Sequence, residues 1–203
     1  MTLSLKVLSP GFAQWLHPDR VMRASGSCTL IRSPDQTVLV DTLGPWETSR
    51  LKDLLDAQGL HPDDVNVVVC THGHPDHVGN LNLFTRSRVH VVGFSVYEED
   101  RYSMHPFDQD KPFIVGPGIE VIPTPGHTLT CVSVVAKDVD RLGTVVIAGD
   151  LFERQQDLQD EHIWINAGSE NPTAQRLNRQ KVLDMADYIV PGHGDMFKVV
   201  KEN

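Results

Sequence analysis

The stretch THGHPDH at residues 71–77 constrains this chain more than any other. It places three histidines and one aspartate within six residues, directly after the apolar run at residues 65–70. Imidazole nitrogens and carboxylate oxygens are common ligands of Zn²⁺, and a turn that leaves a strand lets side chains two to five residues apart converge on one point. The motif therefore predicts a metal-binding turn, and a solvated polar loop is the alternative reading.

Length and composition bound the organisation of the chain. Its 203 residues include 40% hydrophobic and 22% charged side chains, which is typical of a globular protein, and we expect residues 1–203 to form a single domain. Residues 1–10 lack the charged start and the long apolar run of a secretory signal, and no run approaches membrane-spanning length. We therefore expect neither a secretory leader nor a membrane partner.

Cysteine usage and charge bear on compartment and partners. Cys28, Cys70 and Cys131 are odd in number and lack CxxC spacing, so we interpret them as buried free thiols in a reducing compartment. The net charge of −9 repels polyanions, so any binding of nucleic acid needs local positive charge. The candidates for such a phosphate track, with solvated surface as the alternative, are Arg86, Arg88, Arg101, Arg154, Arg176, Arg179 and Lys181.

Hydrophobic patterns predict alternating strands and helices. We expect strands at residues 3–8, 26–31, 37–40, 65–70, 88–92, 119–122, 131–136, 144–148 and 188–190. Helices are expected at residues 46–58, 78–84 and 172–186, the last with Asn171 as its N-cap. Residues 93–118 show no clean period and predict a long surface connection, in which Tyr102, His105 and Phe107 either contact substrate or pack irregularly.

Four predicted strands end in side chains that can bind metal: the cluster at residues 72–77, His127, Asp150 and His193. Taken singly, each of the last three would suit a turn or a cap. Together they make seven ligand-type side chains, too many for one tetrahedral zinc but suited to two metals that share a carboxylate. Asp41, after the strand at residues 37–40, is either a partner for a metal-bound histidine or a cap.

The order HxHxDH, TPGHT, AGD and PGHG, from Asp41 to His193, resembles the metallo-β-lactamase fold superfamily. The resemblance implies an α/β fold, a four-layer αβ/βα sandwich of two mixed sheets with outer helices. It also implies two Zn²⁺ per chain and a role for Asp41 beside a metal-bound histidine. The implied ligands are His72, His74 and His127 at the first metal, Asp76, His77 and His193 at the second, and Asp150 as the bridge, with Asp76 and Asp150 as the catalytic carboxylates.

Residues 40–46, 71–84, 116–118, 132–135, 142–153 and 190–194 narrow the resemblance to one subfamily. It implies an endoribonuclease that cleaves replication-dependent histone pre-mRNA at its 3′ end through a metal-bridging hydroxide. It further implies a homodimer in the cytosol and nucleus. Asp150 and His193 are only 43 positions apart, so the domain that larger RNA-cleaving members insert there is absent from this interval, and substrate must be bound by loops of the core or by a second subunit.

Three alternatives remain open at this stage. A glyoxalase II-like thioester or lactone hydrolase would direct the same hydroxide at a carbonyl group, and it suits the acidic charge better. Oxidation at a single Fe²⁺ held by two histidines and a carboxylate is a second alternative. The presence of Asp76, His77 and His193 argues against it, because these residues favour a second metal. The third is a catalytically silent module that binds metal.

Overall fold

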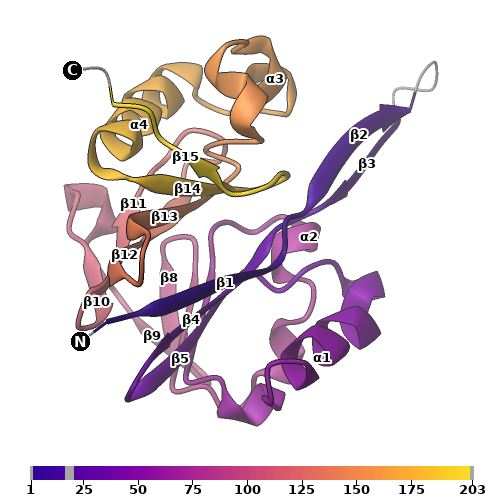
Figure 1. The fold of residues 1–203 in the computed structure, drawn as a ribbon, viewed down its shortest axis with the longest axis vertical. Helices are drawn as coiled ribbons and strands as arrows, with labels where there is room; N and C mark the ends of the chain where they lie inside the picture. Colours follow the sequence, from indigo (N-terminus) through magenta and orange to yellow (C-terminus); the bar gives the residue numbers. More distant parts are fainter. Residues whose placement is uncertain (1, 17–20, 202–203) are drawn as a thin grey trace.

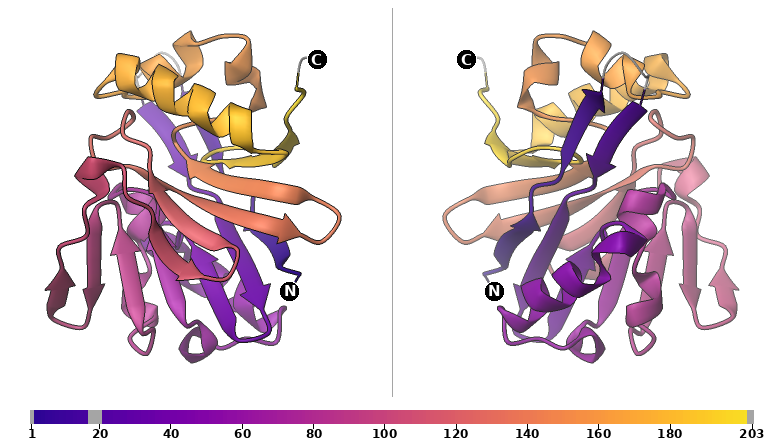
Figure 2. Two further views of the ribbon diagram at one scale, coloured as in Figure 1. Left: turned by 90° about the vertical axis from the view of Figure 1, so that its left-hand side faces the viewer. Right: turned by 90° about the vertical axis from the view of Figure 1, so that its right-hand side faces the viewer.

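Two mixed β-sheets pack face to face, and helices cover their outer faces, in the computed structural model of residues 2–16 and 21–201 (Figures 1 and 2). The layers therefore run helix, sheet, sheet, helix. The predicted fold class, an α/β four-layer sandwich of two mixed sheets with outer helices, is confirmed.

The first sheet has the strand order β1 (Ser4–Ser9), β4 (Cys28–Ser33), β5 (Gln36–Val40), β6 (Val67–Cys70), β7 (Val89–Val92), β8 (Ser95–Glu98) and β9 (Arg101–Ser103). The second has the order β10 (Phe113–Gly116), β11 (Ile119–Pro123), β12 (Val132–Val139), β13 (Gly143–Gly149), β14 (Tyr188–Pro191) and β15 (Phe197–Lys198). Strands β2 (Phe12–Leu16) and β3 (Val21–Ser25) form a separate ribbon that projects beyond the first sheet (Figure 1).

Four α-helices complete the described structure: α1 (Thr48–Asp56), α2 (Pro75–Val78), α3 (His162–Asn166) and α4 (Pro172–Met185). Helix α1 lies on the outer face of the first sheet, and α4 lies on the outer face of the second (Figure 2). Single 3-10 turns occur at Pro45–Glu47, Pro62–Asp64, Leu81–Leu83, Phe107–Gln109 and Gln155–Leu158.

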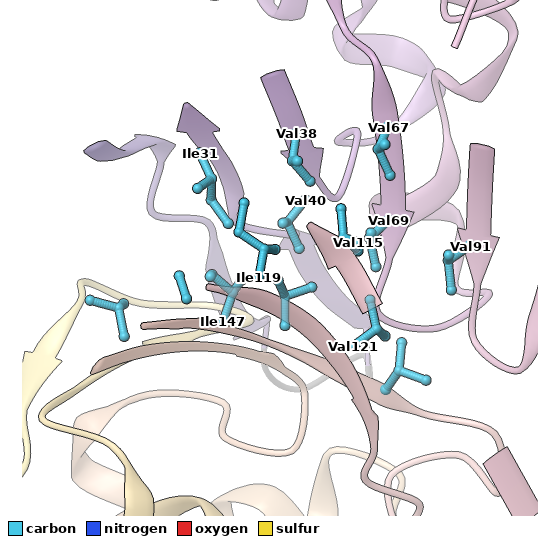
Figure 3. Close-up of a cluster of buried hydrophobic side chains, with 14 of the residues drawn as sticks. Ile31, Val38, Val40, Val67, Val69, Val91, Val115, Ile119, Val121 and Ile147 are labelled. Carbon is cyan, nitrogen blue, oxygen red and sulfur yellow. The ribbon is translucent and has the colours of Figure 1, made fainter. Parts of the chain in front are cut away.

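Alternation along the central strands explains the layers. In β6, Val67 and Val69 face the second sheet, whereas Val68 and Cys70 pack beneath α1. Ile147 of β13 belongs to the same cluster as Val67 and Val69 and comes from the opposite sheet. Figure 3 shows these branched side chains filling the space between the sheets. Burying a branched apolar side chain contributes about 1.5–3 kcal/mol, so this interface is a major source of the stability of the sandwich.

Parallel pairing decides where the polar turns meet. Strand β5 pairs in parallel with β6, and β13 pairs in parallel with β14. Their carboxyl ends therefore lie at one edge of each sheet, where ligands commonly bind in α/β proteins. Asp41 and the turn at residues 71–74 leave the first sheet at this edge, and Asp150 and the turn at residues 192–193 leave the second.

Two predictions of local structure are wrong. Residues 93–118 form β8, β9, β10 and a 3-10 turn instead of a surface connection. The prediction missed these strands because they are too short to show a hydrophobic period. The helix expected at residues 78–84 ends at Val78, since the side chain of Asn80 turns back to donate to the carbonyls of Thr42 and Gly44.

The three side chains in residues 93–118 that the sequence offered as substrate contacts, or as irregular packing, take part in packing contacts. Phe107 is buried in the core between the sheets, and His105 packs against its ring. Tyr102 stacks on Tyr97 of the neighbouring strand, with 5.2 Å between ring centroids. Packing therefore accounts for Phe107, whereas Tyr102 stays largely exposed on its strand.

The prediction of buried free thiols is confirmed for Cys28, Cys70 and Cys131. Burial raises the pKa of the Cys131 thiol to about 11, so this group is a poor nucleophile at neutral pH. Across residues 2–16 and 21–201, no helix combines the length and the apolar character needed to cross a membrane.

Candidate metal centre

The seven predicted ligand side chains lie together at the edge where the carboxyl ends of β6, β13 and β14 meet the turn after β11. They fall into two sets. Within each set the nitrogen and oxygen atoms that could bind a metal lie within 4.8 Å of one another. The first set is His72, His74, His127 and Asp150, and the second is Asp76, His77 and His193.

The first set surrounds a point suited to one cation. The Nδ1 atom of His74 lies 2.8 Å from Nε2 of His72 and 3.1 Å from Nε2 of His127. The Oδ2 atom of Asp150 lies 3.3 Å from the His127 nitrogen and 3.5 Å from the His72 nitrogen. A tetrahedral zinc with ligands at 2.0–2.2 Å places those ligands about 3.3–3.6 Å apart, so the four atoms need only small outward shifts.

The second set shares Asp150 with the first. The Nε2 atoms of His77 and His193 each lie 3.9 Å from Oδ2 of Asp76. They also lie 3.2 Å from Oδ1 and 3.3 Å from Oδ2 of Asp150, respectively. Among the described residues, Nε2 of His77 and Oδ1 of Asp150 are buried without a hydrogen-bond partner despite their closeness. Two buried lone pairs that face each other are satisfied by a cation between them, as a metal site requires.

Acceptors outside the site fix the protons of two histidines. The Nδ1 atom of His77 lies 2.8 Å from Oδ2 of Asp41, and Nδ1 of His193 lies 3.1 Å from the carbonyl oxygen of Ser25. Because a carbonyl and a carboxylate only accept, each Nδ1 carries the proton. When the ring is neutral, its Nε2 therefore directs a lone pair into the site, which is the form that binds metal.

His72, the first histidine of the motif, is oriented in the same way, through a hydrogen bond from its Nδ1 atom. The hydroxyl of Thr71 donates to Asp41 and lies 3.1 Å from Nδ1 of His72, from which it can only accept. The backbone N–H of Thr71 also donates to Oδ1 of Asp41, at 2.7 Å. Asp41 is fully buried and joins the turns after β5 and β6, so it orients His77 directly and His72 through Thr71.

Charges in the site reinforce one another. Burial alone would raise the pKa of Asp150, but His193, His77 and His72 around it hold that pKa far below its usual value. Burial would likewise lower the pKa of His193, yet Asp150 raises it to about 9. In the metal-free chain the shared carboxylate thus attracts protons to the positions where a metal cation would place its charge.

The site opens to solvent on one side. His74 is exposed and the side chain of Asp76 is 16% exposed, whereas His72, His77, His127 and His193 are buried. A groove of about 410 Å³ borders the opening and is lined by Phe12, Met22, Arg23, Ala24, Trp46, Pro75 and Asp76. The base of the β2–β3 ribbon therefore forms one wall of the approach to the metal-binding residues.

Helix α4 supports the second half of the site in a way that the sequence did not reveal. The side-chain amide of Gln175 donates to the carbonyls of Asp150 and Leu151, at 3.0 and 3.3 Å. A Cβ at residue 126 would collide with Gln175, so the turn before His127 needs Gly126. The available signal was weak, because a single glutamine inside a helix, 25 residues from Asp150 in sequence, belongs to no motif.

The seven cations suggested for a phosphate track are engaged with other groups of the chain. Five of the seven cations pair with carboxylates: Arg86 with Asp63, Arg101 with Glu98, Arg176 with Glu161, Arg179 with Asp157, and Lys181 with Asp110. Of the other two, Arg88 donates to the side chain of Gln36 and Arg154 to the carbonyl of Ala13. Of the two alternatives, the structure favours cations paired on the surface or in the core. The sequence left both open because spacing along a chain does not reveal which carboxylate lies opposite each cation.

Known proteins match both the sequence and the structure. A model of the metallo-beta-lactamase superfamily matches residues 22–193. Metallo-beta-lactamase domain-containing protein 1 of Xenopus laevis is 44% identical over 200 residues, which cover 98% of this chain and 82% of that protein.

Solved structures resemble the fold at low sequence identity. A quorum-quenching N-acyl homoserine lactone hydrolase has a TM-score of 0.71 and 21% identity, and covers 96% of this chain and 93% of its own. A dizinc quorum-quenching lactonase with bound product has a TM-score of 0.63 and 17% identity, and covers 90% and 82% of the two chains. These likenesses support the four-layer fold.

Proposed function

The chain belongs to the metallo-beta-lactamase superfamily, and on this premise we propose that it is a metal-dependent hydrolase that holds two Zn²⁺ ions with its seven histidine and aspartate ligands. The observation that carries the proposal is the direction of the lone pairs. His72, His77 and His193 each turn Nε2 toward Asp150, because acceptors outside the metal-binding cluster hold the proton of the other ring nitrogen. A cation between them would satisfy Nε2 of His77 and Oδ1 of Asp150, which are buried without hydrogen-bond partners.

Two divalent ions held there would supply water with a lowered pKa and would polarise a phosphoryl or carbonyl oxygen. The residues of the chain provide the geometry for this chemistry. Asp150 presents one oxygen to His77 and the other to His72, His127 and His193, so it fixes the two positions relative to each other. Asp41 keeps the ring of His77 oriented, and the exposed His74 and Asp76 leave an approach for substrate.

For the substrate we propose RNA, with endonucleolytic cleavage of replication-dependent histone pre-mRNA at its 3′ end. The groove beside Asp76 supports this choice, because it combines the aromatic side chains of Phe12 and Trp46 with the guanidinium group of Arg23. Aromatic faces stack on unpaired bases, and arginine attracts phosphate. Arg23 lies 5.8 Å from the ring centre of Phe12, so both features act on the same stretch of strand.

Hydrolysis of a lactone or thioester is the second candidate. The same groove offers apolar surface to an acyl chain, and a net charge of −9 does not oppose a small neutral substrate. A solved lactonase shares the fold with a TM-score of 0.71. The metal-binding residues would then activate water against a carbonyl carbon instead of phosphorus.

We also propose that the protein acts as a homodimer in the cytosol and nucleus. Trp15, Leu16 and Val21 are exposed on the β2–β3 ribbon, and a second subunit would remove this apolar surface from water. The three buried free thiols fit a reducing compartment. Light scattering on the purified chain tests the dimer, and fractionation of cells that make it tests the compartment.

Metal analysis followed by an activity assay on the same sample tests the hydrolase. We expect about two zinc ions per chain and cleavage of a labelled histone pre-mRNA 3′ fragment. Asp150→Ala should abolish cleavage and reduce occupancy at both positions, because both sets depend on this carboxylate. Two zinc ions without RNA cleavage, but with turnover of a lactone or thioester, would replace the RNA proposal. Near-normal turnover by the variant would refute the shared-carboxylate arrangement.

A further inference from the structure

Glu153 is a buried carboxylate beside the proposed second metal position, and it is not one of the seven ligands assigned above. It follows β13 by four residues and is only 3% exposed. Its Oε2 atom lies 4.0 Å from Nε2 of His193. One ligand atom each from Asp150, Glu153 and His193 lie within 4.8 Å of one another, so Glu153 extends the same cluster.

No arginine or lysine among the described residues pairs with Glu153, and its only basic neighbour there is His193, itself one of the proposed ligands. Its Oε1 atom is buried and makes no hydrogen bond. The buried guanidinium of Arg179 pairs with Asp157, and the side chain of Arg154 donates to the carbonyl of Ala13. A buried carboxylate without a cation is strongly unfavourable, so the position calls for a positive charge that no arginine or lysine supplies.

The main chain holds Glu153 in place. Its carbonyl accepts the N–H of His193 at 2.9 Å, and its own N–H donates to Oδ2 of Asp157 at 2.7 Å. Asp157 is anchored in turn by Arg179, at 2.8 Å. With the backbone fixed on both sides, the carboxylate stays on the inner side of the turn, against the cluster.

We propose that Glu153 is a further carboxylate ligand of the second metal position, an inference that rests on the proposed function because it requires a metal there. That position would then draw on three carboxylates and two histidines: Asp76, Asp150, Glu153, His77 and His193. The first position has three histidines and one carboxylate. Oxygen-rich sites favour harder divalent cations such as Mn²⁺ or Fe²⁺ more than imidazole-rich sites do, so the two positions differ in metal preference, with the second favouring the harder ion.

Metal competition on matched variants tests the proposal. Metal-free wild type, Glu153→Gln, Glu153→Asp and the exposed control Glu98→Gln are titrated with Zn²⁺ and with Mn²⁺ against a chromophoric chelator. We expect Glu153→Gln to weaken the second ion at least about tenfold, the scale seen when groups that support metal ligands are lost, and to leave the first ion unchanged. Glu98 pairs with Arg101 on the surface, so its variant should match wild type.

The aspartate variant separates ligation from simple charge. It keeps the charge but is one methylene shorter, so a true ligand contact is lost and the affinity stays low. Wild-type affinity in Glu153→Gln, or its restoration in Glu153→Asp, would overturn the proposal.

Co²⁺ absorption of the wild type provides a measurement that needs no variant to fold. Five or more ligands at the second position predict weak bands from the second ion, whereas intense four-coordinate bands would refute the added ligand. A wild type that binds fewer than two ions would instead overturn the proposed dinuclear function, and the role of Glu153 with it.

Discussion

Replacing Asp41 by asparagine isolates the orienting role of this residue. The backbone of Asp41 has a φ of 60°, a left-handed conformation that asparagine tolerates better than alanine, so the change adds little strain. The amide oxygen of the variant can still accept the N–H of Thr71, which leaves the NH₂ group facing Nδ1 of His77. Two donors would then oppose each other, and the ring of His77 must move its proton to Nε2, the atom that faces the metal position.

The expected losses of metal affinity and of folding stability in Asp41→Asn follow from the contacts that change. A proton on Nε2 removes one ligand of the second metal, and loss of groups that orient metal-bound histidines typically costs 10–100-fold in affinity, or about 1.4–2.7 kcal/mol. In the metal-free chain, the hydrogen bonds from Thr71 and His77 lose their charged acceptor. Charged hydrogen bonds contribute about 1.5–3 kcal/mol and neutral ones about 0.5–1.5 kcal/mol, so we expect about 1–3 kcal/mol of lost stability.

Stepwise chelator titration measures the loss of metal affinity, and urea unfolding of the metal-free chain measures the loss of stability. The second ion should leave Asp41→Asn at a lower chelator concentration than in wild type, while the first ion, held by His72, His74 and His127, changes less. Asp187→Asn serves as the control, because Asp187 caps Thr144 far from the ligands. If Asp41→Asn retained both ions with wild-type affinity, the assignment of the His77 proton would be refuted.

Two other predictions concern the support and the protonation of the site. Gln175→Met should destabilise the chain by about 1–3 kcal/mol in thermal or urea unfolding, because it leaves the carbonyls of Asp150 and Leu151 without their donor; unchanged stability would contradict the bracing role of α4. The pKa of His193 is raised from its ordinary 6.5 to about 9, so this residue stabilises the metal-free chain below pH 6.5 and that contribution disappears as the pH rises through about 9. At pH 7.5 a metal must therefore displace this proton, and calorimetry in buffers of different ionisation enthalpy should detect its release; a heat independent of buffer would show the prediction wrong.

The sequence predicted most of the elements that place the candidate ligands, for a physical reason. Runs such as residues 65–70 are apolar on both faces because β6 is covered on both faces. Burial on both sides requires apolar residues at every position, so the strand can be predicted from residue type alone. The ligand-type residues follow such strands at once, so their common location could be predicted from parallel pairing. Whether metal binds them stays a prediction.

What the sequence did not reveal depends on contacts between distant segments. The β2–β3 ribbon was missed because Phe12, Trp15 and Leu16 are all partly exposed, so no alternation marks a core-facing side. Gln175 gains its role only because α4 passes over the turn after β13. The pairing of Arg179 with Asp157, which removed one cation from the proposed phosphate track, likewise joins positions 22 residues apart.

The division of the ligands between the two sheets has a mechanical consequence. His72 and His77 belong to the half built on β6, whereas His127, Asp150 and His193 belong to the half built on β11, β13 and β14. Each bound ion would therefore tie one half of the sandwich to the other, across an interface packed mainly with nonpolar side chains. Loaded protein should resist separation of its halves by force or by protease far longer than stripped protein, so the supply of metal in the cell would set the lifetime of the molecule as well as its chemistry.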